Sequence, residues 1–466
     1  MPEDTGQLAA VEHIVVLMLE NRSFDHMLGW LYTDEGNVSP SKQPYEGLTG
    51  TESNPDENGK SVMVFRIDGT AAGAYFMPGA DPGEGYEPTN RQLFGTATPG
   101  GSAPTNDGFV TDYADTLVLR ARQHRPIYPG TTSADIMGCF TPQALPVLAG
   151  LARGFAVADH WFASAPTETL PNRALACAGT SQGHMDDGTH TFTVPSIFGR
   201  LSDHGLDWAV YGYEKQPLTR GNFPDTTLAP ASHFGLFPDF RTAAAGGTLP
   251  AFTFLEPSWS STGNSQHPNY DVALGEQLIL DVYRALRDGP TWASTLLIIT
   301  YDEHGGCYDH VPPPDGAVPP DSSAGEFGFG FTRFGVRVPT VLVSPLIEPG
   351  TVFRVPEGTT LLDHTSVLKT VQQRWNLPPL TARDAAAPGI GTVLTRTTPR
   401  TDDPLAGVTA PTSTGTNPAE HEISHLEQVQ ADLVARELIP RVQGPVTPHP
   451  GSVGWTSPAS RGVEWR

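Results

Sequence analysis

Two apolar runs each lead to a pair of oxygen-bearing side chains: Glu20 and Asn21 directly after residues 11–19, and Asp302 and Glu303 one residue after 295–300. Such runs predict buried strands of a mainly parallel sheet, and the carboxyl ends of parallel strands meet at one edge. Oxygen donors from two strand ends are the ligands that Mg²⁺, Mn²⁺ or Ca²⁺ prefers. Either pair alone would also be typical of a turn or a helix cap. The prediction of a divalent-cation site therefore rests on finding both pairs.

A hydroxyl that such a cation could activate lies in PNRALACAGTSQG, residues 171–183. Thr180 follows Gly179, which lets the backbone turn tightly and present the hydroxyl near a helix start or an anion nest. A threonine hydroxyl is a weak nucleophile near neutral pH, and coordination to a cation favours its alkoxide. Gly179, Thr180 and Ser181 could equally form only a turn, and the residue types alone do not separate Thr180 from Ser181.

The segments around these residues predict an α/β core. Residues 270–287 have the broadest helical apolar stripe and lead into the strand at 295–300, which is the order of a parallel α/β unit. Ser23 can cap a short helix after the first strand. Further elements are expected as a helix at 141–156, strands at 155–162 and 337–345, and a helix at 364–375.

The turn-rich segments predict insertions into this core and not separate domains. Residues 33–129 contain PSKQP, ADPGEG and ATPGGSAP, with a strand signal only at 61–67, and residues 214–250 show little periodicity. We expect one catalytic domain over residues 1–396 that includes both insertions. Residues 397–466 are predicted to form a Pro/Thr-rich surface linker and a C-terminal extension with an amphipathic helix at 419–438.

The composition restricts the partners of the protein. Lys and Arg number 28 against 51 Asp and Glu, and the formal net charge of -23 disfavours nucleic acid and anionic membranes as partners. Three cysteines without close spacing indicate neither a disulfide framework nor a zinc finger. No run is long enough to span a bilayer and the first residues do not resemble a signal peptide. We therefore expect a soluble protein, cytoplasmic as written, although an exported mature form would look the same.

Several segments together resemble a known family. They are HIVVLMLENRSFDHMLGWL near the start, MGCF with LPVLAGLARGFAVADHWFASAPTETLPNRALACAGT, YDEHGGCYDHVPPP, and FGVRVPTVLVSP with DHTSVLKTVQQRW, spread over residues 11–390. They resemble the phosphoesterase family of bacterial non-specific phospholipases C and related acid phosphatases, within the alkaline phosphatase superfamily. The resemblance implies an alkaline-phosphatase-like core, a mainly parallel β-sheet flanked by helices, with large loop-rich insertions.

The resemblance also implies roles for individual residues. The ligands of one divalent cation, Mg²⁺, Ca²⁺, Mn²⁺ or Zn²⁺, would be Glu20, Asn21, Thr180, Asp302 and Glu303. Thr180 would also be the nucleophile and form a covalent phosphothreonine. His267, in an HP dipeptide before the long helix, would contact the phosphoryl oxygens or protonate the leaving group.

Other basic side chains are candidates because of their positions. His304 lies beside the acidic pair and could act as a general acid or stabilise developing charge. His233, in PASHFGLF, could face the substrate, and Arg173 could clamp a phosphate or bridge carboxylates within the fold. His421 and His425 have helical spacing but no third ligand nearby, which favours a solvated helix face.

These features predict hydrolysis of a phosphate ester. The first expectation is a phospholipase C type phosphodiesterase that acts on a substrate such as a phospholipid headgroup, because Glu303 in place of a second aspartate follows that branch of the family. The alternatives are a phosphomonoesterase of the acid phosphatase type and a catalytically silent protein that keeps the fold and binds its ligand.

Overall fold

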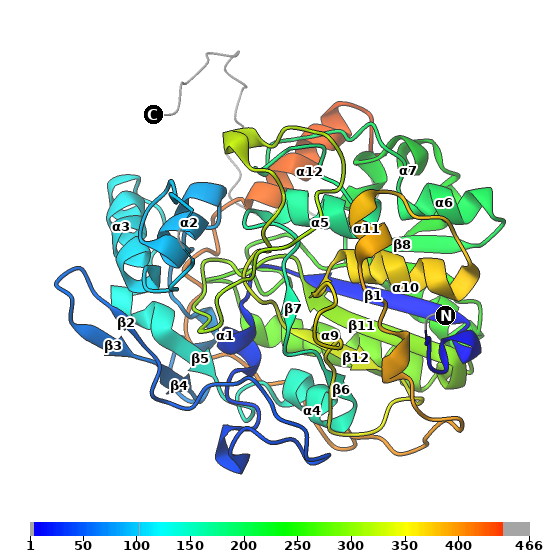
Figure 1. The fold of residues 1–466 in the computed structure, drawn as a ribbon, viewed down its shortest axis with the longest axis horizontal. Coiled ribbons are helices and arrows are strands. Elements are labelled where there is room, and N and C mark those ends of the chain that lie inside the picture. Colours follow the sequence, from blue (N-terminus) through cyan, green and yellow to red (C-terminus); the bar gives the residue numbers. More distant parts are fainter. Residues whose placement is uncertain (1–3, 102, 441–466) are drawn as a thin grey trace.

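The computed structural model describes residues 4–101 and 103–440, and an eight-stranded sheet forms its centre (Figure 1). The strands, in their order across the sheet, are β13 (Thr351–Val352), β6 (Ala156–Val157), β12 (Thr340–Val343), β11 (Thr295–Tyr301), β1 (His13–Leu19), β10 (Phe252–Glu256), β8 (Trp208–Gly212) and β9 (Phe234–Leu236). Strands β11, β1, β10, β8 and β9 are parallel, whereas β12 is antiparallel to both of its neighbours. The predicted mainly parallel α/β sheet is confirmed.

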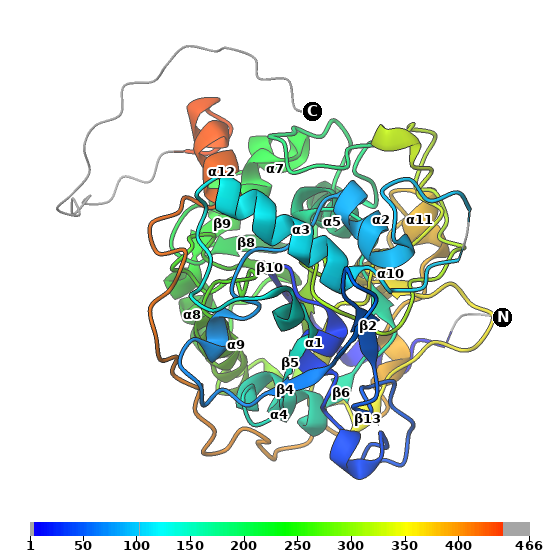
Figure 2. The ribbon, with the colours of Figure 1, turned by 90° about the vertical axis from the view of Figure 1, so that its left-hand side faces the viewer.

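Helices cover both faces of this sheet. Figures 1 and 2 show α5 (Thr169–Ala178), α6 (Ile197–Asp203) and α10 (Thr365–Trp375) on one face, and α4 (Pro146–Gly154), α8 (Phe237–Gly246) and α9 (Val272–Arg287) on the other. Contacts of α5 with α6 and α10, and of α9 with α4 and α8, agree with these two layers. A parallel sheet has both faces covered in this way because its crossover helices pack back onto it.

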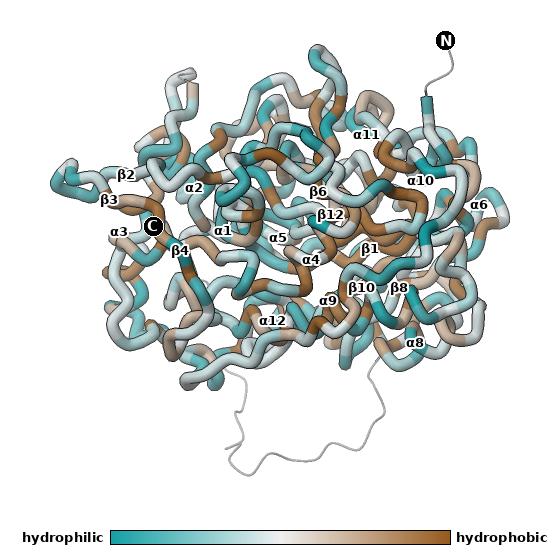
Figure 3. Tube along the Cα trace, turned by 90° about the horizontal axis from the view of Figure 1, so that it is seen from below, coloured by the Kyte–Doolittle hydropathy of each residue, from teal (hydrophilic) through white to brown (hydrophobic). Residues whose placement is uncertain are grey.

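The core lies between the sheet and these helix layers. Every residue of β11, and every residue of β1 after His13, is buried. Figure 3 shows the hydrophobic stretches along β1 and its neighbours in the interior, with hydrophilic segments around them. Strands buried on both faces appear in the sequence as continuous apolar runs, which is why β1 and β11 could be predicted within two residues.

Shorter strands differ more from their predicted bounds. The strand expected at 155–162 is divided into β6 and β7 (Trp161–Phe162), and β7 pairs with β14 (Leu362–Asp363) in a separate small sheet. The strand expected at 61–67 is likewise two strands, β3 (Ser61–Met63) and β4 (Phe65–Ile67). They pair with different partners, β2 (Ser53–Pro55) and β5 (Gly138–Phe140).

The first insertion contains helices that the sequence did not predict. They are α2 (Tyr86–Phe94) and α3 (Phe109–Arg122), which pack on each other over a small apolar cluster that includes Leu93, Phe109 and Tyr113. Only five residues of α3 are buried, so its apolar periodicity is weak. Residues 33–129 are therefore a structured layer beside the core and not only loops.

Short helices complete the described fold: α1 (Phe24–Leu28), α7 (Pro224–Leu228) and α11 (Ala382–Ala386). The hydroxyl of Ser23 accepts the N–H of His26 at 3.2 Å, so the predicted cap of α1 is confirmed. In residues 4–101 and 103–440, no helix has both the length and the apolar character that crossing a bilayer demands.

The segment after residue 396 packs on the rest of the molecule. Leu405 belongs to the main core, and the hydroxyl of Tyr283 donates to Asp403 at 2.7 Å. The predicted C-terminal helix is shorter than expected, as α12 (His425–Ala435), and Ser424 caps it by accepting the N–H of Glu427. The division of the chain at residue 396 stays a prediction, and residues 441–466 of the extension lie outside the described residues.

Candidate active site

The two predicted oxygen-donor pairs meet at the carboxyl edge of the sheet. Strands β1 and β11 are parallel neighbours with Leu19 opposite Tyr301, so the residues that follow them are adjacent. The backbone N–H of Asn21 donates to Oδ1 of Asp302 at 3.0 Å. The structure therefore brings Glu20, Asn21, Asp302 and Glu303 together, and all four are buried.

Asn21 turns the chain at the end of β1. Its φ is 58°, a left-handed conformation that asparagine tolerates better than most residues with a side chain. Its Oδ1 accepts the hydroxyl of Thr169 at 3.1 Å. The Thr169 hydroxyl therefore reaches the donor pair at the end of β1 through Asn21.

Thr169 lies at the first turn of α5 and lines a cavity of about 380 Å³. Glu20 and His267 line the same cavity. The carboxylate of Asp187 accepts the N–H of Leu170 at 2.6 Å and so fixes this first turn. The amino end of a helix has free N–H groups and a partial positive charge, which favour a bound anion.

Thr180 lies beyond the other end of the same helix. Gly179 ends α5 in a left-handed conformation with φ of 72°, as a tight turn requires. The Thr180 hydroxyl donates to Oδ2 of Asp321 at 2.6 Å and accepts the N–H of Gln182. Because α5 has ten residues, its length of roughly 15 Å separates Thr180 from the first turn. The structure does not bring Thr180 to Glu20, Asn21, Asp302 and Glu303.

Arg173 holds the site together from within the fold. Its Nε donates to Oδ2 of Asp302 at 2.8 Å, and a terminal nitrogen donates to the carbonyls of Met18 and Leu19 at the end of β1. Its guanidinium also lies 4.5 Å from the ring centre of Trp259. Of the two predicted alternatives, these contacts match the bridging of a carboxylate within the fold.

His267 lies between two carboxylates that the sequence did not single out. Its Nε2 is 3.2 Å from Oε1 of Glu84, and its Nδ1 is 3.9 Å from Oδ1 of Asp81. Burial alone would lower the pKa of His267, but Glu84 and Asp81 raise it well above its ordinary value. The imidazole is therefore held in its charged form at the wall of the cavity.

His304 and His233 do not line this cavity. His304 is buried between Gln92 and Glu303, and its Nε2 is 2.8 Å from Oε1 of Gln92. Burial lowers the pKa of His304 to about 3. His233 stacks on Trp208, the first residue of β8, which places it at the amino edge of the parallel strands. That edge is opposite the candidate site, so the structure does not bring His233 to the other candidates.

Three buried carboxyl groups at the cavity and close to the strand ends have raised pKa values. Burial, together with the charge of Asp302, raises the pKa of Glu20 to about 7, and burial raises the pKa of Glu168 to about 7. Burial and the charge of Glu84 raise the pKa of Glu303 well above its ordinary value. Its Oε1 is buried without a hydrogen-bond partner among the described residues. Buried oxygen donors with uncompensated charge are compatible with a divalent cation.

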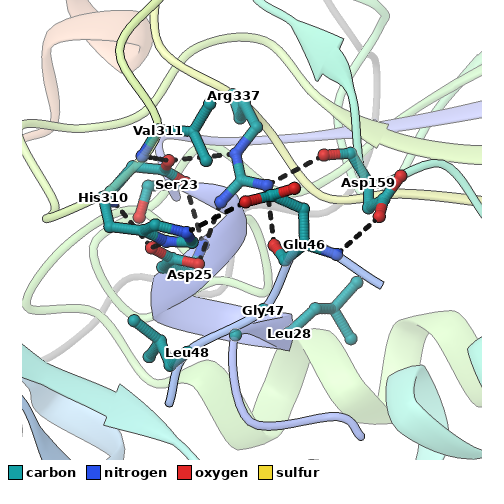
Figure 4. A network of polar contacts seen from close by, with 12 residues as sticks. Ser23, Asp25, Leu28, Glu46, Gly47, Leu48, Asp159, His310, Val311 and Arg337 are labelled. Carbon is teal, nitrogen blue, oxygen red and sulfur yellow. Dashed lines mark hydrogen bonds and ion pairs between the residues drawn. The ribbon is translucent and has the colours of Figure 1, made fainter. Parts of the chain in front are cut away.

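Two groups of three metal-ligand side chains occur in the described part of the chain: Asp81, Glu84 and His267 in the cavity, and Asp25, Asp309 and His310 outside its lining. Figure 4 shows Arg337 beside Asp25 and His310 of the second group. Its Nε donates to Asp309 and a terminal nitrogen donates to Asp25, both at 3.0 Å. The buried arginine already supplies positive charge there, and the network ties α1 to the loop that follows Glu303.

A model of the Phosphoesterase family matches residues 11–378. The chain belongs to this family. One similar protein is Non-specific phospholipase C6 of Arabidopsis thaliana, 37% identical over 444 residues that cover 91% of this chain and 79% of that protein. Another is Phospholipase C A of Mycobacterium tuberculosis (strain ATCC 25618 / H37Rv), 30% identical over 423 residues, or 80% of this chain and 74% of that protein. The family resemblance is confirmed, and it includes plant as well as bacterial proteins.

Among solved structures, the fold is similar to a protein in the alkaline phosphatase superfamily from Vibrio parahaemolyticus. The sequence identity is 14%, the TM-score is 0.30, and the match covers 53% of this chain and 65% of the other.

This phosphoesterase-family site contains residues that sequence reasoning missed. Thr169 is one of them. Pro171 could have indicated that a helix begins near Thr169, because proline fits the first turn of a helix. His425 is another: it lines the cavity from the start of α12. The capping pattern from Ser424 to Glu427 marks the start of that helix, but it does not indicate where the helix packs.

Proposed function

We propose that this phosphoesterase-family chain hydrolyses phosphodiesters of the phospholipid type, with Thr169 as its nucleophile. The observation that supports this most directly is the hydroxyl of Thr169 on the side chain of Asn21, at the wall of a cavity shared with Glu20 and His267. The names of the similar plant and mycobacterial proteins support a phospholipase C reaction. The proposal gives Thr169 the role that the family resemblance suggested for Thr180.

The residues of the chain divide the work of this reaction. Thr169 attacks phosphorus and the alcohol oxygen of the lipid leaves, so the phosphothreonine that forms still carries the headgroup as an ester. Water then hydrolyses the bond between Thr169 and phosphorus and releases the phosphomonoester. The phosphoryl group binds at the amino end of α5, where the partial positive charge of the helix favours an anion although the Leu170 N–H is taken by Asp187, and the charged His267 stabilises the negative oxygens. Because Asn21 and Asp187 fix the side chain and the backbone around Thr169, the nucleophile is oriented before the substrate binds.

One divalent cation, Mg²⁺, Ca²⁺, Mn²⁺ or Zn²⁺, suits the donor set at the strand ends by its chemistry, although these carboxylates do not form one of the two compact ligand groups in the described part of the chain. The residues that would hold it are Glu20, Asn21, Thr169, Asp302 and Glu303, all of which offer oxygen atoms. The unpaired Oε1 of Glu303 and the buried carboxyl group of Glu20, whose pKa burial raises to about 7, are compatible with a cation at this position. When bound, the cation would favour the alkoxide of Thr169 and offset charge on the phosphoryl oxygens.

Matched valine substitutions test this proposal. We expect Thr169→Val to lower turnover of p-nitrophenyl phosphorylcholine by at least about 10³-fold, because it removes the nucleophile and keeps the side-chain shape. Thr180→Val is the control: it removes the two hydrogen bonds of that hydroxyl, to Asp321 and from Gln182, and should keep activity within about tenfold of wild type.

Three further measurements accompany the two valine variants. Acid quenching and intact-mass analysis should detect a phosphorylated wild type and no such species in Thr169→Val. Turnover of p-nitrophenyl phosphate measures the competing monoesterase reaction, and EDTA tests the need for a cation. Full activity of Thr169→Val, or loss of the phosphoenzyme only in Thr180→Val, would contradict the assignment.

A further inference from the structure

The start of α12 brings a second histidine to the cavity. His425 is the first residue of α12 and lines the cavity together with Thr169 and His267. Its Nδ1 is 3.9 Å from Oδ2 of Asp187, whose other oxygen accepts the N–H of Leu170. One carboxylate therefore links the imidazole to the turn that presents Thr169.

The position of His425 is fixed by the packing of α12. Leu426, Val429 and Leu433 are buried in an apolar cluster with Leu170 and Trp259. The Ser424 hydroxyl both caps the helix and donates to the carbonyl of Trp259. Because Leu170 directly follows Thr169, the helix that presents His425 packs on the residue next to the nucleophile.

Depth in the cavity distinguishes His425 from the other groups. Thr169 is only 1% exposed, so it lies at the inner wall, whereas the side chain of His425 is 59% exposed and lies toward solvent. In phosphoryl transfer the attacking and leaving oxygens are roughly in line with phosphorus. An attack from the inner wall therefore directs the leaving oxygen outward, toward the part of the cavity where His425 lies.

We propose that His425 is a catalytic residue that protonates the leaving oxygen and then accepts a proton from the hydrolytic water; this inference rests on the proposed function. In the first step the Thr169 oxygen bonds to phosphorus, after its proton has passed to water. The bond to the leaving oxygen breaks, and that oxygen keeps the electron pair and takes a proton from the imidazolium. In the second step water gives a proton to the neutral imidazole as it attacks phosphorus, and the Thr169 oxygen leaves and regains a proton from solvent.

The charges around the two histidines support this division of roles. His267 is held charged by Glu84 and Asp81, so it releases a proton less readily. Burial lowers the pKa of His425 from its ordinary value. The negative charges of Asp186 and Asp81 oppose this shift, and the positive charges of His267 and Arg125 add to it. Asp187 is 3.9 Å from the ring, and Glu20, Glu84 and Glu422 line the same cavity. A histidine that can both give and take a proton suits a two-step hydrolysis.

Asparagine substitutions at two histidines of one segment test the proposal. His425→Asn is the variant, and His421→Asn is its matched control, because His421 is exposed and does not line the cavity. Two substrates differ in their need for an acid: p-nitrophenyl phosphorylcholine has a weakly basic leaving group, and a short-chain phosphatidylcholine releases a strongly basic alcohol oxygen.

We expect His425→Asn to lose on the order of 100-fold in kcat with phosphatidylcholine and less than about fivefold with the p-nitrophenyl substrate. The control should match wild type with both. An equal loss with both substrates, or wild-type turnover of phosphatidylcholine, overturns the assignment. A merely structural role would not produce dependence on the leaving group.

A binding measurement separates failure of this inference from failure of the proposed function. The NMR signal of the His425 imidazole is identified as the one that wild type shows and His425→Asn lacks. Its chemical shift in wild type is then followed as inorganic phosphate is added. If wild type hydrolyses neither substrate, the proposed function fails, and the phosphate titration still decides whether His425 faces the anion. A shift of that signal supports the placement, and an unchanged signal at saturating phosphate overturns it.

Discussion

Glu20→Gln should stabilise the cation-free protein while abolishing its activity. Burial and the charge of Asp302 raise the pKa of Glu20 from 4.5 to about 7, although His267 and Arg173 act against this shift. An ionised Glu20 therefore opposes folding at pH 8. The amide of glutamine has nearly the same shape and no charge, so the substitution removes this unfavourable contribution.

The size and the sign of the effect follow from the same pKa. The rise from 4.5 to about 7 is roughly two and a half pH units, each of which corresponds to about 1.4 kcal/mol, so the contribution is about 3 kcal/mol. Between these two pH values the folded state binds more protons at Glu20 than the unfolded state does. Wild type should therefore lose stability relative to Glu20→Gln as pH rises from 4.5 to 7, and the two should coincide at pH 4.

Thermal unfolding in EDTA measures this difference. For a chain of this size, about 3 kcal/mol corresponds to a Tm difference of about 3 °C at pH 8. Glu57→Gln, at an exposed loop position, is the control and should follow wild type at every pH. Saturating Mg²⁺ or Ca²⁺ should reverse the order at pH 8, because the cation stabilises a folded wild type that holds all of its ligands.

A variant Glu20→Gln that is less stable than wild type at pH 8 in EDTA would refute this reasoning. So would a Tm difference that does not change with pH. Either result would mean that Glu20 is stabilised by contacts that already compensate its charge, and the argument for a cation beside Glu20 would lose its main support.

Two packing predictions concern the supports of the site. Arg337→Lys should lower the free energy of unfolding, measured in urea, by about 3 kcal/mol. The reason is that the buried Asp25 and Asp309 lose a planar partner that reaches both. An unchanged midpoint of urea unfolding would contradict a structural role for this network. Leu433→Ala should cost about 2–4 kcal/mol of local stability in α12 and increase hydrogen exchange in residues 425–435. Turnover should fall as the local stability of α12 falls. Full activity together with increased hydrogen exchange in α12 would contradict a catalytic role for that helix.

The central sheet could be predicted because its strands are buried on both faces. The continuous apolar runs of β1 and β11 leave little choice of structure, and the polar pairs after them meet because the strands are parallel neighbours. The layer formed by α2 and α3 could not be predicted in the same way. These helices bury few side chains, and their packing depends on contacts with distant segments such as β5.

The choice of nucleophile shows where sequence reasoning stops. Thr169 and Thr180 lie at opposite ends of one ten-residue helix, and both are hydroxyls near a helix terminus. The glycine before Thr180 marks the carboxyl end, because a left-handed glycine typically ends a helix, whereas the nucleophile proposed here lies at the amino end, which attracts anions. Which end faces the carboxyl edge of the sheet depends on the path of the chain through β7 and α5, and that path has no local signal.

The cavity is completed by residues outside the segment that matches the family. The match ends at residue 378, whereas Glu422, Ser424 and His425 line the cavity. Contacts link this segment to the core of the site, because α12 packs on Trp259, Trp259 stacks on Arg173, and Arg173 holds Asp302. A change in α12 can therefore alter both the leaving-group side of the cavity and the carboxylate beneath it. If phosphoesterase chemistry belongs to the matched core, the C-terminal segment is where this chain can set which leaving group it accepts.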